Sequence, residues 1–137
     1  MYASADLTTA VAEYEQELGI PPATFCAYDV DVAGILDLRD SSVLAACGMA
    51  PEVRFAPWKT LLLIEQTRPP GWDIAERLVA SGCAGILVPS VRLAGGGNLV
   101  LWRWNDAATR TVAAIDPQGD LPRDQLSWPV APPAPLE

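Results

Sequence analysis

The residue with the most chemical context in this sequence is Ser90, which follows the apolar segment 85–89. An apolar run of this length, between Gly82 and Pro89, predicts a buried strand that ends at the serine. Three consecutive glycines follow at residues 95–97. A hydroxyl at the end of a buried strand, beside a flexible glycine loop, is a common element of small-molecule sites. The alternative, which the sequence leaves open, is that Ser90 only caps a turn.

The other candidates lie near the N-terminus, where Tyr2 carries a phenol and Glu13 a carboxylate. The helix expected around Glu13 has one apolar face, formed by Leu7, Ala10, Val11, Tyr14 and Leu18. Glu13 lies off the centre of that face, so the pattern alone predicts a solvated helix acid. Tyr2 would be an ordinary strand aromatic. No periodicity connects either residue with Ser90.

Composition bounds the class of protein. Half of the 137 residues are hydrophobic and 19% are charged, which predicts one globular domain with its own core. The formal net charge of −8 argues against direct binding of nucleic acid, which needs clustered Lys and Arg. Histidine is absent, which excludes His triads, His metal ligands and His bases.

The redox and membrane signals point to the cytoplasm. Three cysteines, Cys26, Cys47 and Cys83, form no C-x-x-C pair, and we expect them to be reduced, buried thiols. No segment is long enough to span a membrane, and the chain starts without a basic-then-apolar signal pattern. We therefore expect a cytoplasmic protein.

The elements that must position the candidate residues are short. The pattern predicts helices over residues 6–18, 41–46 and 73–82, and Asp73 would be the N-cap of the last one. It predicts strands at residues 1–3, 24–32, 35–38, 98–104 and 111–115, in addition to the strand that ends at Val88. The strands at 98–104 and 111–115 are expected to form a hairpin, and the segment 61–64 fits a helix or a strand. This irregular order favours an α+β domain over a doubly wound sheet. We expect one domain over residues 1–128 and a Pro-rich tail over residues 129–137.

Taken together, the segments resemble the RES-domain family. The matching pieces, in order, are Tyr2–Ser4 leading to Thr9, Ala10 and Glu13; Tyr28–Val30 with Ile35–Leu38; Trp58; Ala75 with Leu78; Gly82; Gly85–Ser90 with Arg92; and Asn98–Val100. No single piece is specific, but their order and spacing together are fairly so. The family is named for an Arg, a Glu and a Ser; the Glu matches Glu13 and the Ser matches Ser90.

The resemblance implies a fold like that of ADP-ribosyltransferases, with a split, mixed β-sheet core and short helices. It implies a toxin of a type II toxin–antitoxin module, similar to ParT-like toxins and paired with an Xre-type antitoxin. Such a toxin consumes NAD+, either transferring ADP-ribose to a protein target or cleaving NAD+ with water or phosphate. The catalytic residues would be Glu13 and Ser90, and the residues on NAD+ would be Tyr2, Ser90 and Arg92, without a metal.

One motif position has no match. The family's Arg precedes the tyrosine that Tyr2 matches, and here only Met1 precedes it; Arg39 and Arg92 do not match the motif. The expectation is that the N-terminal strand and its Arg are either cut off or lost. The alternative functions are accordingly a catalytically inactive RES-like protein that only binds its antitoxin, and an unrelated α+β interaction domain. We expect no direct contact with nucleic acid or a membrane.

Overall fold

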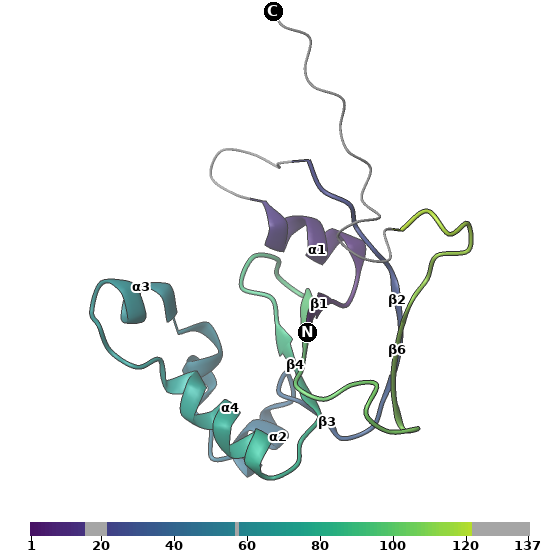
Figure 1. The fold of residues 1–137 in the computed structure, drawn as a ribbon. Coiled ribbons are helices and arrows are strands. Elements are labelled where there is room, and N and C mark those ends of the chain that lie inside the picture. Colours follow the sequence, from purple (N-terminus) through teal and green to yellow (C-terminus); the bar gives the residue numbers. More distant parts are fainter. Residues whose placement is uncertain (16–21, 57, 122–137) are drawn as a thin grey trace, which may run out of the picture.

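The computed structural model describes residues 1–15, 22–56 and 58–121. Four short strands form its central sheet: β1 (Tyr2–Ser4), β3 (Ile35–Asp37), β4 (Gly85–Pro89) and β5 (Gly97–Leu101). Their order is β1–β5–β4–β3 (Figure 1). β3 runs parallel to β4, and the other neighbours are antiparallel. The sheet is therefore mixed, and it joins the N-terminal strand to segments almost 100 residues away, since Tyr2 pairs with Val100.

The predicted hairpin between residues 98–104 and 111–115 is wrong. The strand at Arg110–Ala114, β6, pairs instead with β2 (Tyr28–Val32) in a separate two-stranded sheet. The physical reason is that β5 already uses both of its edges, one against β1 and one against β4. The strand expected from residue 24 begins only at Tyr28, because the ladder with β6 ends where Ala27 O accepts a hydrogen bond from Ile115 N at 2.8 Å.

The helices begin where capping residues place them. α1 (Leu7–Tyr14) starts after Asp6, whose side chain accepts a hydrogen bond from Thr9 N, and α2 (Ser41–Ala46) starts after Asp40 in the same way. The ambiguous segment is helical, in α3 (Trp58–Leu63), and follows a short 3-10 helix, η1 (Pro51–Phe55). The predicted end of the first helix, at Leu18 and Gly19, lies outside the described residues.

The last helix starts earlier than predicted. α4 (Pro70–Ala80) has Pro69 as its N-cap, so Asp73 is not the cap and lies in the first turn. Proline at the first helical position suits a helix start because its missing N–H would have no partner there. Asp73 pairs with Arg68 at 2.7 Å and places a negative charge at the favourable end of the helix.

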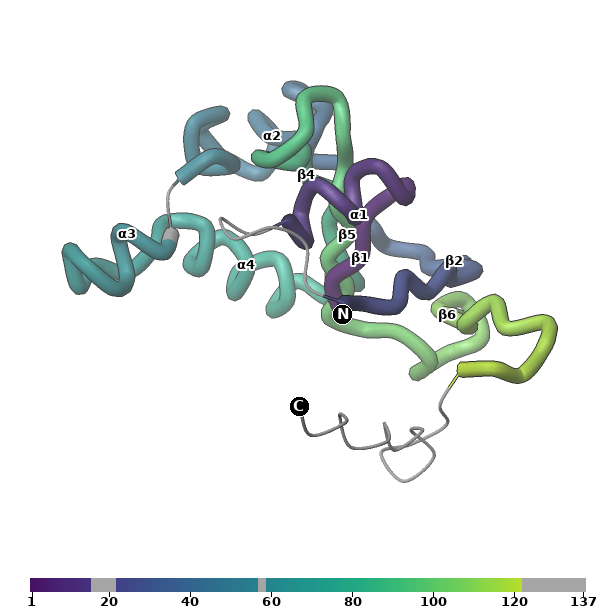
Figure 2. Tube along the Cα trace, turned by 90° about the horizontal axis from the view of Figure 1, so that it is seen from above, coloured from purple at the N-terminus to yellow at the C-terminus, as the bar shows by residue number. Residues whose placement is uncertain are grey.

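The hydrophobic core lies between these helices and the central sheet. Its buried residues are Leu38, Leu44, Met49 and Ile74, and Leu36, Ile86 and Val88 of the sheet region pack against them. Figures 1 and 2 place α2, α3 and α4 on one side of the sheet and the β2–β6 pair on the other. The expected α+β class with a split, mixed sheet and short helices is confirmed. Among the described residues, no helix has the length and apolar character needed to cross a membrane.

Candidate functional site

One face of the central sheet carries the polar side chains that the sequence singled out. Tyr2 and Ser4 on β1 pair with Val100 and Asn98 on β5. Because paired residues and every second residue along a strand share a face, these four side chains lie on the same side. Ser90 lies just past the end of β4, and its side chain bonds to the same residue, Glu13, as the side chain of Asn98 does. We call this side the site face.

Glu13 lies over the site face, at the last turn of α1. Its Oε1 accepts a hydrogen bond from Ser90 Oγ at 2.6 Å and another from Asn98 Nδ2, also at 2.6 Å. These residues are 77 and 85 positions away in the sequence. The structure thus brings Glu13 and Ser90 into direct contact, and the catalytic roles assigned to them stay predictions.

Asn98 is the main residue of the site that sequence reasoning missed. Only 2% of its surface is exposed, and its Oδ1 accepts a hydrogen bond from Ser4 Oγ at 2.9 Å. That bond leaves the amide NH2 directed at Glu13. The signal in the sequence was a lone amide inside the apolar strand Gly97–Leu101, since a buried polar side chain needs a partner.

Ser90 combines the two interpretations that the sequence left open. Its Oγ accepts hydrogen bonds from the backbone N–H of Arg92 at 3.1 Å and of Leu93 at 3.0 Å, so it does cap the turn after β4. The same oxygen donates its own proton to Glu13. The turn therefore fixes the hydroxyl that orients the carboxylate.

Arg92 reaches back to α1. Its Nη2 donates to Glu15 O at 2.5 Å and its Nε donates to Ala12 O at 3.4 Å. The guanidinium thus binds backbone carbonyls on both sides of Glu13 in the sequence. A cation is favourable at the C-terminal end of a helix, where carbonyl groups lack partners. The structure thus gives Arg92 a part in holding α1, and its predicted contact with NAD+ stays a prediction. The other arginine considered, Arg39, forms a two-pronged ion pair with Asp37.

Tyr2 lies at the open edge of the site and is 58% exposed. Partial burial of the ring, followed by the negative charge of Glu13, raises the pKa of its phenol to about 12. Tyr2 is therefore a neutral hydrogen-bond donor at physiological pH, close enough to Glu13 to feel its charge. A neutral aromatic ring at this place can stack on a flat ligand.

The start of α1 is locked against the glycine loop. Thr9 is fully buried, and its Oγ1 donates to Asp6 Oδ2 at 2.7 Å. A Cβ added to Gly96 would lie only 2.7 Å from Thr9 Oγ1. The glycine is thus required by the close approach of the loop to α1, and this packing sets the height of Glu13 above the sheet.

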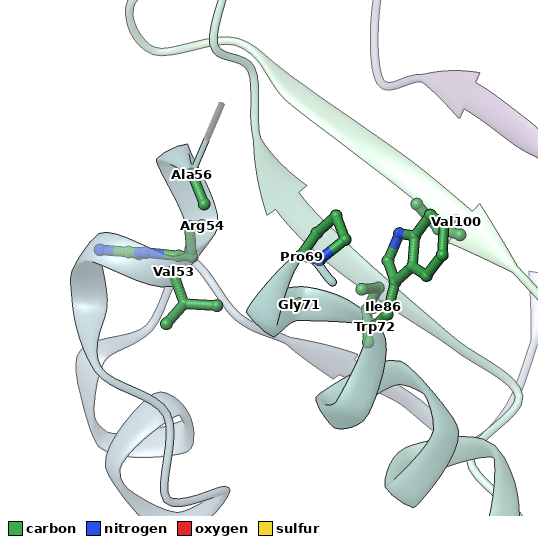
Figure 3. Close-up of a pocket in the computed structure, with 8 residues that line it drawn as sticks. All are labelled: Val53, Arg54, Ala56, Pro69, Gly71, Trp72, Ile86 and Val100. Atoms are coloured by element: carbon green, nitrogen blue, oxygen red, sulfur yellow. The ribbon is translucent and has the colours of Figure 1, made fainter. Parts of the chain in front are cut away.

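A cavity of about 490 Å³ lies between η1, the start of α4 and the central sheet (Figure 3). Its floor includes Ile86 and Val100, which are paired across β4 and β5, and Trp72 of α4 forms part of its wall. Val100 also pairs with Tyr2. The cavity therefore reaches the site face at Val100, whereas Glu13, Ser90 and Asn98 do not line it.

The architecture defines an α+β protein whose candidate site is a half-buried carboxylate, Glu13, oriented by a serine hydroxyl and an asparagine amide. The RES-domain model matches residues 1–124, most of the chain, and the protein belongs to the RES-domain family. This is a family of NAD-utilising proteins with an ADP-ribosyltransferase-like fold, which agrees with the mixed sheet and short helices seen here. No curated protein and no solved structure matches the chain with significant similarity.

Proposed function

We propose that this protein is an NAD+-consuming toxin of a type II toxin–antitoxin module and that Glu13 is its catalytic carboxylate. Cleavage of the bond between nicotinamide and ribose builds positive charge on the ribose ring. A fixed negative charge next to that ring lowers the barrier, and one preorganised electrostatic contact of this kind contributes about 3–4 kcal/mol. Membership of the RES-domain family supports NAD+ as the substrate.

The observation that carries the proposal is the way in which Glu13 is held. Both hydrogen bonds from Ser90 and Asn98 go to Oε1, and among the described residues Oε2 has no hydrogen-bond partner. One oxygen thus fixes the carboxylate while the other is available to substrate. The arrangement needs no reorganisation when the charge develops, which is the condition under which such a contact is most effective.

Three acceptors for ADP-ribose fit this chemistry: water, inorganic phosphate and a side chain of a target protein. The test is to incubate the purified protein with NAD+ labelled in the adenylate part, with and without phosphate and with a cell extract. Free ADP-ribose, ADP-ribose phosphate and a labelled protein band identify the three reactions. Release of nicotinamide in none of these conditions would contradict the proposed function.

The proposal includes an Xre-type antitoxin that restrains the toxin in the cytoplasm. The net charge of −8 disfavours direct DNA binding by the toxin, so in this proposal the antitoxin makes the DNA contacts. Co-expression of the chain with the neighbouring open reading frames should bring down a second, smaller protein. Free expression without toxicity and without any co-purifying partner would count against it.

A further inference from the structure

The cavity beside the site face is suited to a flat apolar group. Its volume is about 490 Å³, and its walls come from three parts of the chain: Ala56 after η1, Pro69 and Trp72 at the start of α4, and Ile86 and Val100 on the sheet (Figure 3). The lining is almost entirely apolar. Pockets of this size and character bind small organic ligands.

Trp72 is the residue in this cavity that calls for an explanation. A large aromatic side chain normally gains most by burial, yet Trp72 is 43% exposed and is not part of the hydrophobic core. The Arg68 guanidinium lies 5.8 Å from the centre of its ring and is itself held by ion pairs with Asp73 and Glu76. The indole is thus supported by a cation and forms a wall of the cavity.

The cavity lies close to the carboxylate site along β5. Asn98, the partner of Glu13, and Val100, in the cavity floor, are two residues apart on β5, which is about 7 Å along the strand. Both side chains belong to the site face. A ligand whose ribose lies at Glu13 would therefore have another part within reach of Trp72.

We propose that this cavity binds an aromatic base of the dinucleotide and that Trp72 is the residue on which the base stacks. The inference rests on the proposed function, because it takes NAD+ as the ligand. Both ends of NAD+ carry such a base, nicotinamide at one and adenine at the other, and they share the chemistry of a flat heteroaromatic ring. Stacking on an aromatic side chain is tolerant of the identity of the base.

The experiment measures binding by calorimetry with three probes that need no turnover: AMP, nicotinamide mononucleotide, and ribose 5-phosphate, which has no base. Wild-type protein should bind AMP if the cavity holds adenine and nicotinamide mononucleotide if it holds nicotinamide, and it should bind ribose 5-phosphate more weakly than either. Trp72→Ala should weaken binding of the preferred probe at least about tenfold, and Trp72→Phe should restore most of it. Trp104→Ala, at another partly exposed tryptophan outside the cavity, should change nothing.

A second variant blocks the cavity without removing the tryptophan. Gly71 also lines the cavity, and a Cβ added there meets no atom within 4 Å. Gly71→Leu should therefore keep the thermal stability, since leucine also favours the helix more than glycine, and should lose binding of the same probe. This variant stays informative if Trp72→Ala fails to fold.

The inference is overturned if neither mononucleotide binds better than ribose 5-phosphate, or if the preferred probe binds folded Trp72→Ala and Gly71→Leu as tightly as wild type. These outcomes are distinct from a failure of the proposed function. A protein that binds AMP through Trp72 but never releases nicotinamide from NAD+ would refute the proposed function alone. A protein that consumes NAD+ equally well with both substitutions would refute the cavity alone.

Discussion

Gly96→Ala tests whether the packing of the glycine loop against α1 sets the position of Glu13. The added Cβ would lie 2.7 Å from Thr9 Oγ1, 3.1 Å from Thr9 Cγ2 and 3.2 Å from Leu93 O. Thr9 cannot swing away, because it is fully buried and bonded to Asp6. Overpacking of this kind lowers the free energy of unfolding by about 1–3 kcal/mol. Alanine also reduces the conformational entropy of the unfolded chain, which raises the free energy of unfolding by about 0.4–1 kcal/mol. Gly96 has no positive φ, so the backbone itself adds no strain.

We therefore expect Gly96→Ala to lower the free energy of unfolding by about 1–2 kcal/mol net. Urea unfolding measures this loss directly, and the melting temperature should fall by about 3–8 °C for a chain of this size. The relief must come from moving α1 away from the loop. Because Glu13 moves with the helix, its bond to Ser90 lengthens and turnover of NAD+ should drop more than the unfolded fraction explains.

A double-mutant cycle identifies the contact responsible. In a Thr9→Ala background both clashing atoms of the threonine are gone, so Gly96→Ala should cost less than half of what it costs in wild type. The coupling energy between the two positions is the measured quantity. An equal penalty in both backgrounds would show that the contact with Thr9 does not determine the packing, and the argument for the height of Glu13 would fail with it.

Substitutions at three further positions, Arg92, Asp6 and Tyr2, probe the surroundings of Glu13. Arg92→Gln should lower kcat, because Arg92 holds the end of α1 that carries Glu13, and should cost about 0.3–1 kcal/mol of stability, as expected for a cation at an exposed helix C-terminus. Arg92→Lys should recover part of both losses. Asp6→Ala should destabilise α1 at neutral pH. Hydrogen bonds from Thr9 lower the pKa of Asp6, so the stability that Asp6 provides is present above its unfolded pKa of 3.8 and is lost progressively as the pH falls through its lowered folded pKa. The difference in urea stability between wild type and Asp6→Ala should therefore shrink at pH 3. The absorbance titration of Tyr2, obtained by difference from Tyr2→Phe, should centre near pH 12 and shift to lower pH in Glu13→Gln. In the unfolded chain the Tyr2 phenol ionises near pH 10, before it ionises in the folded protein. The stability that Tyr2 provides should therefore decline between pH 10 and pH 12.

Local signals in the sequence predicted the elements that depend on local chemistry. The helix over residues 41–46 and the strand formed by the apolar run up to Pro89 lie where the pattern predicts them. The pairing of strands was not local. β5 lies between β1 and β4, and β6 crosses to β2, because strand partners are selected by burial of whole faces and not by the turn that follows a strand.

The site shows the same division between local and long-range information. Pattern alone placed Glu13 among solvated helix acids, and only the resemblance to a family joined it to Ser90. No local pattern predicted a role for Asn98 in the site, because no residue near it in the sequence needs an amide partner. Its partners, Ser4 and Glu13, lie 94 and 85 residues away and meet it only through the pairing of β1 with β5 and the packing of α1.

The most direct test of the central claim compares Glu13→Gln with Glu15→Gln in the turnover of NAD+. The two substitutions remove the same charge from the same end of α1, but the side chain of Glu15 is exposed and makes no hydrogen bond in the described structure. If the Glu13 carboxylate stabilises the charge on ribose, kcat should fall by about 100- to 1000-fold in Glu13→Gln, with the melting temperature near that of wild type. Glu15→Gln should keep wild-type kcat. Equal activity of wild type and a folded Glu13→Gln would contradict the account, because the carboxylate would then be no more than an anchor for Ser90 and Asn98.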